Sequence, residues 1–453
     1  MLPAPPEFRP DDTIRSWGRI VRSRHRLARP VFRDQISPLA TTLRAEDPGL
    51  AVGLLRSYGD SNLNPDGRLI AMGGLDRILE FNRETGLFRA EAGLSLSQCL
   101  RVLVPAGWFL PTTPGSRFVT LGGAVANDVH GKNHHSAGSF GNSVIRIALR
   151  RTDGALMELK PDNPLFTATI GGLGLTGIIE WVEFQAKPIK SSSLDAQDLP
   201  FSNVSDYFEL AADHHARFEH TMAWIDCLSS GASLGRGIFS GANWSKQGPL
   251  SVHDEAPRYA MPIEAPAGVL NPLTVRAYNQ LRYSLKSTNR RPYQAHYGSF
   301  LYPLDGIAHW NRLYGRAGFF QYQCVIPAPS AKPATIDLLK RIVRSGEASF
   351  LAVLKDFGPI APRGLLSFPM EGTTLALDFP NRGERTLRLL ADLDAIVLSA
   401  GGRLYPAKDG RISAEMFQAG FPNWSRFKDL VDPGLSSALW RRVSVSSLPE
   451  STP

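Results

Sequence analysis

Three histidines lie within six positions of one glycine-flanked segment, HGKNHHSAGSFG, at residues 130–141. His130 and His134 are four residues apart, and two histidines at that spacing on a helix can share a zinc ion. A zinc protease needs a glutamate directly after the first histidine as its general base, but Gly131 and the cation Lys132 follow instead. Glycine is also a poor helix former. We therefore predict that none of these histidines binds a metal. The segment could be an ordinary polar loop, and the rest of the chain decides whether it has another role.

The composition indicates a globular protein of a reducing compartment. The chain has 453 residues, 43% of them hydrophobic, which allows a large core divided among two or three domains. Its three cysteines, Cys99, Cys227 and Cys324, lie far apart and predict neither a disulfide framework nor a zinc ribbon. The N-terminal residues lack the apolar core of a signal peptide, and the uncharged stretch at 165–179 is too short to span a bilayer. We expect a cytoplasmic protein.

The positive charge is concentrated near the N-terminus. Residues 15–33 hold seven arginines and no acid, which leaves about +1 of the net +8 for the rest of the chain (8 − 7). Such segments can bind to anionic lipid headgroups, and each cation near the membrane surface contributes about 1 kcal/mol to the binding free energy. The alternative is an ordinary solvated face, because the segment has no clear apolar stripe. Peripheral contact with the inner face of the cell membrane therefore stays open, whereas we predict no nucleic-acid partner, since no basic groove with interleaved aromatics follows.

The elements expected around the histidine segment are those of an α+β fold. Strand-like runs occupy residues 51–55, 68–72 and 87–93, and VIRIALRR with ALMELK predicts a hairpin around Asp153 and Gly154. Residues 94–107 predict an amphipathic helix, with Ser95 and Gln98 at the spacing of a capping box and Gly107 as its stop.

Two glycine-rich segments suit the binding of a diphosphate. GLLRSYGD (53–60) follows a strand, and in the segment 114–135 Gly122 and Gly123 lie in the first turn of a helix expected to begin near Thr120. Small residues let a phosphate approach the backbone, and a helix N-terminus offers free N–H groups and the positive end of the dipole. Together with GGLGLTGII at 171–179 they indicate a diphosphate cradle that lacks a GxGxxG motif.

The chain carries, in this order, RSYGD, PGSRFVTLGGAVANDVHGKNHHSAGSFGN, GGLGLTGII, FQYQCVIP, LSFP and GGRLYPAKD. In these motifs it resembles the flavin oxidases of the vanillyl-alcohol oxidase group, and above all the branch that oxidises polyprenyl-phosphoryl pentoses. The resemblance implies a two-domain flavoprotein of the PCMH type. Residues 1–187 and 403–453 would form the FAD-binding domain, and residues 188–402 a substrate domain of antiparallel sheet and helices. The FAD would be non-covalent, because GLLRSYGD has no histidine that could tether it.

The resemblance also implies site residues, although each polar one could instead be structural. The residues implied to bind FAD are Arg56, Ser57, Tyr58, Gly59, Gly115, Ser116, Thr120, Gly122, Gly123, Ala124, Asn127, His130, Gly177, Ile178 and Tyr405. Those implied to line the substrate pocket are Lys132, Trp224, Gln321, Gln323, Lys355, Phe357, Ala376 and Lys408. The catalytic candidates are Lys408, Tyr58, His130 and Lys132, with Lys408 or Tyr58 as the proton acceptor.

The implied function is FAD-dependent oxidation of the C2 hydroxyl of a polyprenyl-phosphoryl pentose, ribose-like, to the 2-keto sugar. This would be the first half of a 2-epimerisation that a short-chain-type reductase completes, in the synthesis of cell wall arabinan. Two alternatives stay open: an FAD-dependent oxidase of a free sugar, alditol or aldonolactone, and a metal-binding or lipid-surface module without turnover.

Four departures from the family pattern leave the pocket shape, the lipid and the sugar open, and one of them is that the arginine-rich N-terminal segment is more basic than the family's. Leu54 and Leu55 replace part of a more glycine-rich turn. A tyrosine of the pocket is displaced by one position, to Tyr302 after Leu301. Ala376 occupies the position of an inhibitor-reactive cysteine.

Overall fold

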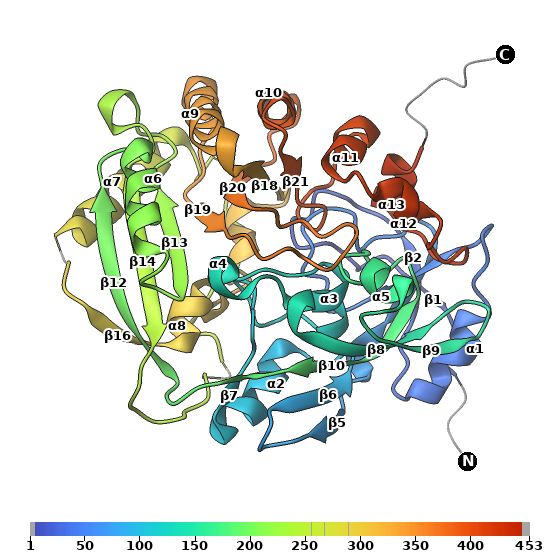
Figure 1. The fold of residues 1–453 in the computed structure, drawn as a ribbon. Coiled ribbons are helices and arrows are strands. Elements are labelled where there is room, and N and C mark those ends of the chain that lie inside the picture. The colour runs from blue at the N-terminus through green and yellow to red at the C-terminus, as the bar shows by residue number, and fades with distance from the viewer. Residues whose placement is uncertain (1–4, 255, 267, 289, 446–453) are drawn as a thin grey trace.

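The computed structural model describes residues 5–254, 256–266, 268–288 and 290–445. Over these residues the chain forms three main sheets with helices packed against them (Figure 1), which confirms the predicted α+β class. Within the described ranges, no helix combines the length and the apolarity needed to span a bilayer.

The first sheet has the strand order β1–β2–β4–β3, formed by β1 (Arg9–Asp11), β2 (His25–Ala28), β4 (Arg68–Ala71) and β3 (Gly49–Val52). β4 pairs in parallel with both β2 and β3. One side of this sheet packs on α1 (Ile36–Ala40), and the other joins the largest core through Leu27, Leu50 and Leu69. β3 stops at Val52, so the expected strand at 51–55 is wrong in its second half. Leu55 has a left-handed φ of 54°, which an extended strand does not allow.

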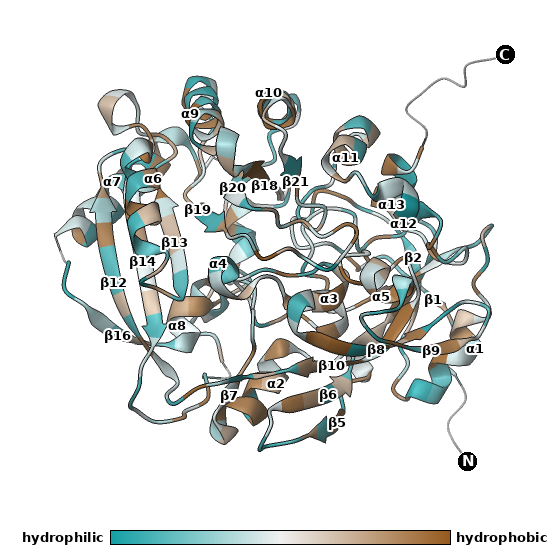
Figure 2. Ribbon diagram, in the orientation of Figure 1, coloured by the Kyte–Doolittle hydropathy of each residue, from teal (hydrophilic) through white to brown (hydrophobic). Residues whose placement is uncertain are grey.

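The second sheet is antiparallel, in the order β5–β6–β10–β8–β9: β5 (Ile78–Phe81), β6 (Leu87–Glu91), β10 (Ile178–Gln185), β8 (Val144–Arg150) and β9 (Leu156–Leu159). β8 and β9 form the predicted hairpin. Helices α2 (Leu96–Leu103), α3 (Leu121–Ala126) and α5 (Pro164–Thr169) share its core, which appears as brown strands and helices in Figure 2.

The predicted signals at the ends of these helices are confirmed. Ser95 caps α2 in a capping box with Gln98, and Gly107 ends the turn that follows in a left-handed conformation. Thr120 caps α3 by accepting a hydrogen bond from the N–H of Gly123.

The third sheet is antiparallel throughout, in the order β16–β12–β14–β13–β19–β20–β18–β21. Its strands are β16 (Tyr293–His296), β12 (Ser193–Phe201), β14 (Gly237–Trp244), β13 (His220–Ile225), β19 (Ala352–Phe357), β20 (Gly372–Pro380), β18 (Phe319–Pro327) and β21 (Arg403–Leu404). Helices α6 (Val204–His214), α9 (Ala328–Ser345) and α10 (Glu384–Ser399) cover one face. The opposite face of β18, β19 and β20 is left to line a cavity.

The remaining elements connect the sheets. They are α4 (His134–Ala137), α7 (Pro272–Ser287), α8 (Tyr297–Leu301), α11 (Ala414–Gly420), α12 (Trp424–Lys428) and α13 (Ala438–Val443), with two short strand pairs, β7 (Trp108–Phe109) with β11 (Lys187–Pro188) and β15 (Tyr259–Ala260) with β17 (Ile307–Ala308). In the C-terminal part of the chain, β21 pairs with β18 in the third sheet, whereas Leu435 forms an isolated β-bridge with Gly49 of β3 in the first sheet. The domain division at residues 187 and 402 stays a prediction.

Candidate active site

A cavity of about 590 Å³ lies where the first sheet, α3 and the inner face of the third sheet meet. Most of its lining comes from residues 50–62, 114–130, 173–179 and 304–310, the strands β18 to β20, and residues 405–408. These parts are far apart in sequence, so the cavity exists only in the complete fold. Its size is that of a site for a small molecule or cofactor.

The third sheet forms one wall of the cavity. Side chains alternate between the faces of a strand, so Gln321 and Gln323 of β18 point into the cavity together with Val353 of β19 and Ala376 of β20. In the register of the sheet, Ala376 lies directly between Gln323 and Val353. The small side chain of Ala376 therefore stands between an amide and an apolar side chain in this wall.

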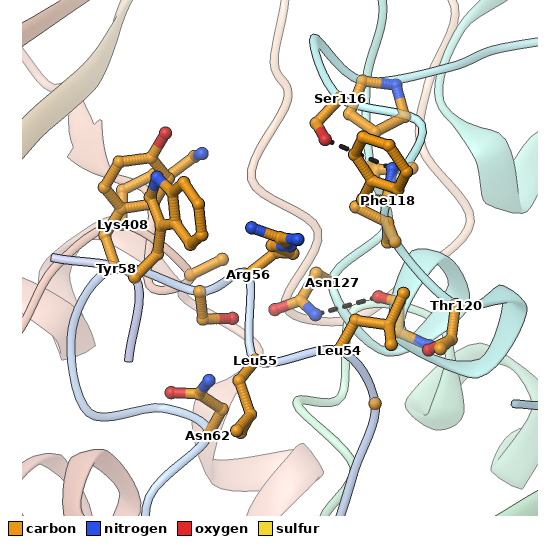
Figure 3. A pocket seen from close by; sticks show the side chains of 18 of the residues that line it. Leu54, Leu55, Arg56, Tyr58, Asn62, Ser116, Phe118, Thr120, Asn127 and Lys408 are labelled. Atoms are coloured by element: carbon orange, nitrogen blue, oxygen red, sulfur yellow. Dashed lines mark hydrogen bonds between the residues drawn. The ribbon is translucent and has the colours of Figure 1, made fainter. Parts of the chain in front are cut away.

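The loop after β3 and the segment around α3 face each other across the cavity (Figure 3). Leu54, Leu55, Arg56, Tyr58 and Asn62 come from the loop, and Ser116, Phe118, Thr120 and Asn127 from the opposite side. The Arg56 guanidinium lies 4.2 Å from the centroid of the Trp17 ring and 5.7 Å from that of Phe118. A cation thus occupies the gap between the two segments.

Two glycines allow these segments to approach closely. A Cβ on Gly53 would lie 2.3 Å from the Thr120 hydroxyl oxygen, and a Cβ on Gly59 would lie 1.7 Å from the carbonyl oxygen of Asp409. Only a residue without a side chain fits at either position. The loop is therefore held against the cap of α3 at one end and against the C-terminal segment at the other.

Lys408, Asp378 and Gln321 form a charged group at one end of the cavity, in which Asp378 is buried and the other two side chains are half-buried. The amide of Gln321 donates to Asp378 at 2.7 Å, and the Tyr314 hydroxyl donates to the same carboxylate at 3.4 Å. Burial raises the pKa of Asp378 to about 7. Burial lowers the pKa of Lys408 to about 8, while the charge of Asp378 opposes this shift. Both groups can therefore change protonation near neutral pH.

A second half-buried lysine, Lys355, lies on the same wall. Lys355 donates to the carbonyl of Gly131 at 3.2 Å, and burial lowers its pKa to about 7, with further lowering by the charges of Lys132 and Lys408. Several cations thus repel one another around this end of the cavity, and a bound anion would relieve that repulsion.

Of the three histidines of the 130–141 segment, His130 and His134 both pack against Phe357, whereas His135 points elsewhere. The amide of Gln323 donates to Nε2 of His130 at 3.0 Å, and the imidazole packs 4.8 Å from the Phe357 ring. His134 is buried with its ring 4.4 Å from Phe357, and His135 donates to the carbonyl of Phe218 at 2.8 Å. In the part of the chain that the structure describes, no three His, Cys, Asp or Glu side chains are grouped as metal ligands.

Asp128 fixes the shape of this histidine segment. Its buried carboxylate accepts hydrogen bonds from the Ser139 hydroxyl at 2.8 Å, the Gly141 N–H at 2.8 Å and the Ser367 hydroxyl at 2.5 Å. Burial lowers the pKa of His130 well below its usual range, and the charges of Lys355 and Lys408 add to this effect. At neutral pH, His130 is therefore an uncharged part of the cavity wall, and it belongs to a segment that Asp128 holds in place.

Most of the predicted site residues line the cavity. They are Arg56, Ser57, Tyr58, Gly115, Ser116, Thr120, Gly122, Gly123, Asn127, His130, Gly177, Gln321, Gln323, Lys355, Ala376, Tyr405 and Lys408. The lining that the described residues form does not include Gly59, Ala124, Lys132, Ile178, Trp224 or Phe357.

Lys132 is the catalytic candidate that the structure separates from the others. Its ammonium donates to the carbonyl of Phe300 and lies 4.8 Å from the centroid of that ring. Burial lowers its pKa to about 7. Tyr302, the displaced tyrosine, is also buried, and its hydroxyl lies 2.7 Å from that of Thr113.

Sequence reasoning missed Asp378 and Asp305. Asp378 follows Ala376 by two positions on a strand, so the period of two alone would have placed both on one face. Asp305 lines the opposite side of the cavity and accepts a hydrogen bond from the N–H of Arg117 at 2.7 Å. No local pattern in the sequence marks Asp305.

The arginines of residues 15–33 largely pair within the protein. Arg19 pairs with Glu264, Arg26 with Asp47, Arg29 with Asp11 and Arg33 with Glu91. Four of the seven positive charges are thus matched by acids from other parts of the chain. This pairing favours a structural role for much of the segment over a lipid-binding one.

Curated proteins with similar sequences establish the family. A family model described as an FAD binding domain matches residues 28–160. The decaprenylphosphoryl-β-D-ribose oxidase of Mycolicibacterium smegmatis is 38% identical over 426 residues, which cover 90% of this chain and 92% of that protein. The chain belongs to the decaprenylphosphoryl-β-D-ribose oxidase family. It is an FAD-dependent oxidoreductase, and the predicted PCMH-type flavoprotein fold and FAD cofactor are confirmed.

Other relatives match this member of the decaprenylphosphoryl-ribose oxidase family less fully. An uncharacterized Streptomyces coelicolor protein in the mprA 5′ region is 32% identical over 376 residues, which cover 78% of this chain and 100% of that protein. The L-gulonolactone oxidase of Mus musculus is 29% identical over 127 residues, 27% of this chain and 28% of that enzyme. The short match to the mouse enzyme carries no argument about the substrate.

The residues around the cavity fit FAD. Arg56 Nε, Ser61 Oγ and both polar atoms of the Asn62 side chain are buried and have no hydrogen-bond partner among the described residues. In the same part of the chain, the N–H groups of Leu55 and Ser57 also have no acceptor. Buried polar groups need partners, and the diphosphate and hydroxyls of FAD supply acceptors and donors. The loop 53–62 and the segment 114–127 would therefore hold the cofactor.

Proposed function

We propose that this oxidoreductase oxidises the C2 hydroxyl of a polyprenyl-phosphoryl pentose to the 2-keto sugar. The observation that supports this substrate class is the cavity end where Lys355 and Lys408 stand beside Gln321 and Gln323. Cations pair with a phosphate, and amides pair with the hydroxyls of a sugar. The M. smegmatis relative is named for an oxidation of decaprenylphosphoryl-β-D-ribose.

The chemistry divides between cofactor and protein. Conversion of a secondary alcohol to a ketone removes a hydride from the carbon and a proton from the hydroxyl. Bound FAD supplies the acceptor for the hydride. The protein must supply the acceptor for the proton and hold the sugar in the orientation that the transfer needs.

Lys408 is the better of the two candidates for the proton acceptor. Its pKa, lowered by burial to about 8, makes a neutral amine available near neutral pH. Burial instead raises the pKa of Tyr58 well above its usual value, so Tyr58 stays protonated and cannot take the proton from the substrate. Lys355 would then pair with the substrate phosphate, because an anion relieves the repulsion that Lys132 and Lys408 exert on Lys355.

We further propose that the 2-keto product passes to a short-chain-type reductase. Return of a hydride to the opposite face of C2 would invert that carbon, so the two enzymes together would be a 2-epimerase. An epimerised pentose on a polyprenyl phosphate is the kind of donor that cell wall arabinan synthesis uses.

Anaerobic bleaching of the flavin absorbance tests the substrate class. Polyprenyl-phosphoryl ribose should bleach the bound flavin, whereas free pentoses, alditols and aldonolactones should not. A matched compound without the phosphate, a polyprenyl ribofuranoside, should bleach it much more slowly. Bleaching by a free sugar or aldonolactone at a comparable rate would overturn the proposal and favour an oxidase of free sugars.

A further inference from the structure

Helix α7 (Pro272–Ser287) carries an apolar stripe that the protein leaves uncovered. Leu273, Leu281 and Leu285 are 77%, 60% and 65% exposed, and Tyr278 is 41% exposed. At 3.6 residues per turn these four side chains lie along one side of the helix. Large apolar side chains gathered on one side of a helix, rather than scattered singly, indicate a contact surface.

The opposite side anchors the helix to the protein. Val275 and Asn279 are buried, and the Asn279 amide donates to Asp226 at 2.8 Å. An Asn271 side chain caps the N-terminus in a capping box. The apolar stripe therefore belongs to an ordered helix with one face fixed and the other free.

The charged residues of α7 itself are all cations, although Asp198 of β12 lies beside Tyr278, Leu281 and Leu285. α7 contains Arg276, Arg282 and Lys286 but no Asp or Glu. Lys286 pairs with Asp198, whereas Arg276 and Arg282 have no acid partner in the part of the chain that the structure describes. Arg282 donates to the Tyr278 hydroxyl at 3.0 Å and lies over the Trp224 ring, so Arg276 is the cation of the helix left exposed and unpaired among the described residues. Exposed leucines with a cation and no acid on the same helix suit the headgroup region of an anionic bilayer.

The same helix lies close to the cavity. The Arg282 guanidinium is 4.8 Å from the centroid of the Trp224 ring, and Trp224 pairs in register with Val353, which lines the cavity. The Tyr278 ring is 5.9 Å from the ring of Phe350, the neighbour of the lining residue Leu351. A single layer of side chains thus separates α7 from the cavity wall.

We infer that the exposed face of α7, formed by Leu273, Tyr278, Leu281 and Leu285, docks on an anionic lipid bilayer. This inference rests on the proposed function, from which it takes the lipid-linked substrate. A lipid-linked sugar presents its phosphate at the membrane surface. Docking through α7 brings the Trp224 side of the cavity wall next to that surface, where the sugar of a lipid-linked substrate is presented.

Sedimentation with vesicles tests the docking face on the FAD-loaded full chain. The vesicles are phosphatidylcholine with or without 30 mol% phosphatidylglycerol. The test variant is the pair Leu281→Gln and Leu285→Gln, and Arg276→Gln tests the charge. The matched control is Leu156→Gln, since Leu156 on β9 is 49% exposed and distant from α7 in sequence. Bound flavin and the unfolding temperature establish that each variant is folded.

The unmodified chain and Leu156→Gln should sediment with anionic vesicles. The double glutamine variant should bind them about tenfold more weakly or worse, and Arg276→Gln should weaken binding only when phosphatidylglycerol is present. Equal binding by the double variant, or no binding by the unmodified chain, would overturn the inference. So would a dimer of the unmodified chain that becomes a monomer in the double variant, because a second copy would then cover the face.

Turnover separates this inference from the proposed function. With polyprenyl-phosphoryl ribose in detergent, the double variant should reduce its flavin as fast as the unmodified chain, whereas with the substrate in anionic vesicles its KM should rise. A chain that docks through α7 but is not bleached by the lipid-linked sugar would overturn the proposed function alone. Bleaching without α7-dependent docking would overturn the inference alone.

Discussion

The ammonium of Lys408 lies 3.9 Å from the centroid of the Tyr58 ring, in the group at the upper left of Figure 3. The contact joins the loop after β3 to the C-terminal segment. A cation over an aromatic face is held at a defined height, and the ring stabilises only the charged form. Burial favours the neutral form, and the resulting pKa of Lys408 is about 8. The contact with Tyr58 fixes the position of the Lys408 amine, while its pKa of about 8 lets it gain or lose a proton near neutral pH.

Lys408→Ala should slow reduction of the bound flavin by about a hundredfold or more, the effect of losing a positioned acid or base. Rapid mixing under anaerobic conditions measures this rate. Lys408→Arg should not restore it, because a guanidinium has no neutral form near pH 7. Flavin content and unfolding temperature should stay close to those of the unmodified chain. Loss of the flavin together with the activity would show that Lys408 is structural.

Asp378→Asn should shift the pH dependence of flavin reduction to lower pH. If neutral Lys408 accepts the proton, the rate rises with pH through the pKa of Lys408, which is about 8. The Asp378 charge raises that pKa, so its removal should lower the midpoint of the rise. Asp356→Asn is the control, since Asp356 is a buried carboxyl on β19 that hydrogen-bonds to Thr373 instead. An unchanged midpoint in Asp378→Asn would contradict the coupling.

Lys355→Met should stabilise the FAD-free protein at pH 7, by about 1 kcal/mol or more, as replacement of buried charges by apolar side chains often does. The folded-state pKa of Lys355 is about 7, against an ordinary value of 10.5. Between these values the unfolded chain binds more protons, so this group makes the free energy of unfolding increase with pH from about 7 to 10.5. The variant should lose this part of the pH dependence.

Urea unfolding at pH 7 and pH 9 measures both effects of Lys355→Met. Lys340→Met is the matched control, because the Lys340 side chain is 51% exposed on α9 and should change stability little. A Lys355→Met variant less stable than the unmodified chain at pH 7 would show that the hydrogen bond to Gly131 outweighs the desolvation of the ammonium.

Ala376→Cys should create a site for covalent capture of a nitroaromatic inhibitor that the flavin reduces to a nitroso compound. Alanine has no nucleophile, and Cys99, Cys227 and Cys324 are buried and absent from the cavity lining that the described residues form. The unmodified chain should therefore be inhibited reversibly, without a change of mass. Mass spectrometry after incubation with inhibitor and substrate should show an adduct on the variant only. An adduct on the unmodified chain would mean that Ala376 does not face the flavin.

The FAD should be released by acid. The loop that faces the cavity, GLLRSYGD, has no histidine to form a covalent link, and the His130 imidazole is engaged by Gln323. Precipitation with acid should leave a colourless pellet and a yellow supernatant. A pellet that stays yellow after washing would show a covalent bond that these residues do not account for.

Local signals in the sequence predicted much of the fold. The capping box of Ser95 and Gln98, the Thr120 cap and the β8–β9 hairpin were all found, because each depends on residues within a few positions of one another. Most of the candidate site also followed from motifs that the family shares. The end of β3 was missed because it depends on the left-handed conformation of Leu55, a residue that rarely adopts it.

Contacts between distant segments account for what the sequence did not reveal. Asp378 on β20 accepts a hydrogen bond from Gln321, its register partner on the neighbouring strand β18, and this contact makes it part of the site. Lys132 stands in the same motif as His130, yet the two side chains diverge, and the ammonium ends at Phe300. The direction of a side chain in that loop depends on Asp128 and Ser367, which are 239 positions apart. No pattern within the motif encodes such a pairing.

The cavity that would hold FAD is lined at one side by residues 53–62 and at another by Tyr405 and Lys408. A growing chain therefore cannot complete the site until nearly all of it has been synthesised, and capture of the cofactor must be a late event. Once the chain is complete, free FAD that binds only the folded form stabilises it in proportion to RT ln(1 + [FAD]/Kd). A cell short of flavin would thus hold less of the enzyme, because the empty form unfolds more often and is degraded. Of the molecules that remain, a smaller share would carry FAD and be active.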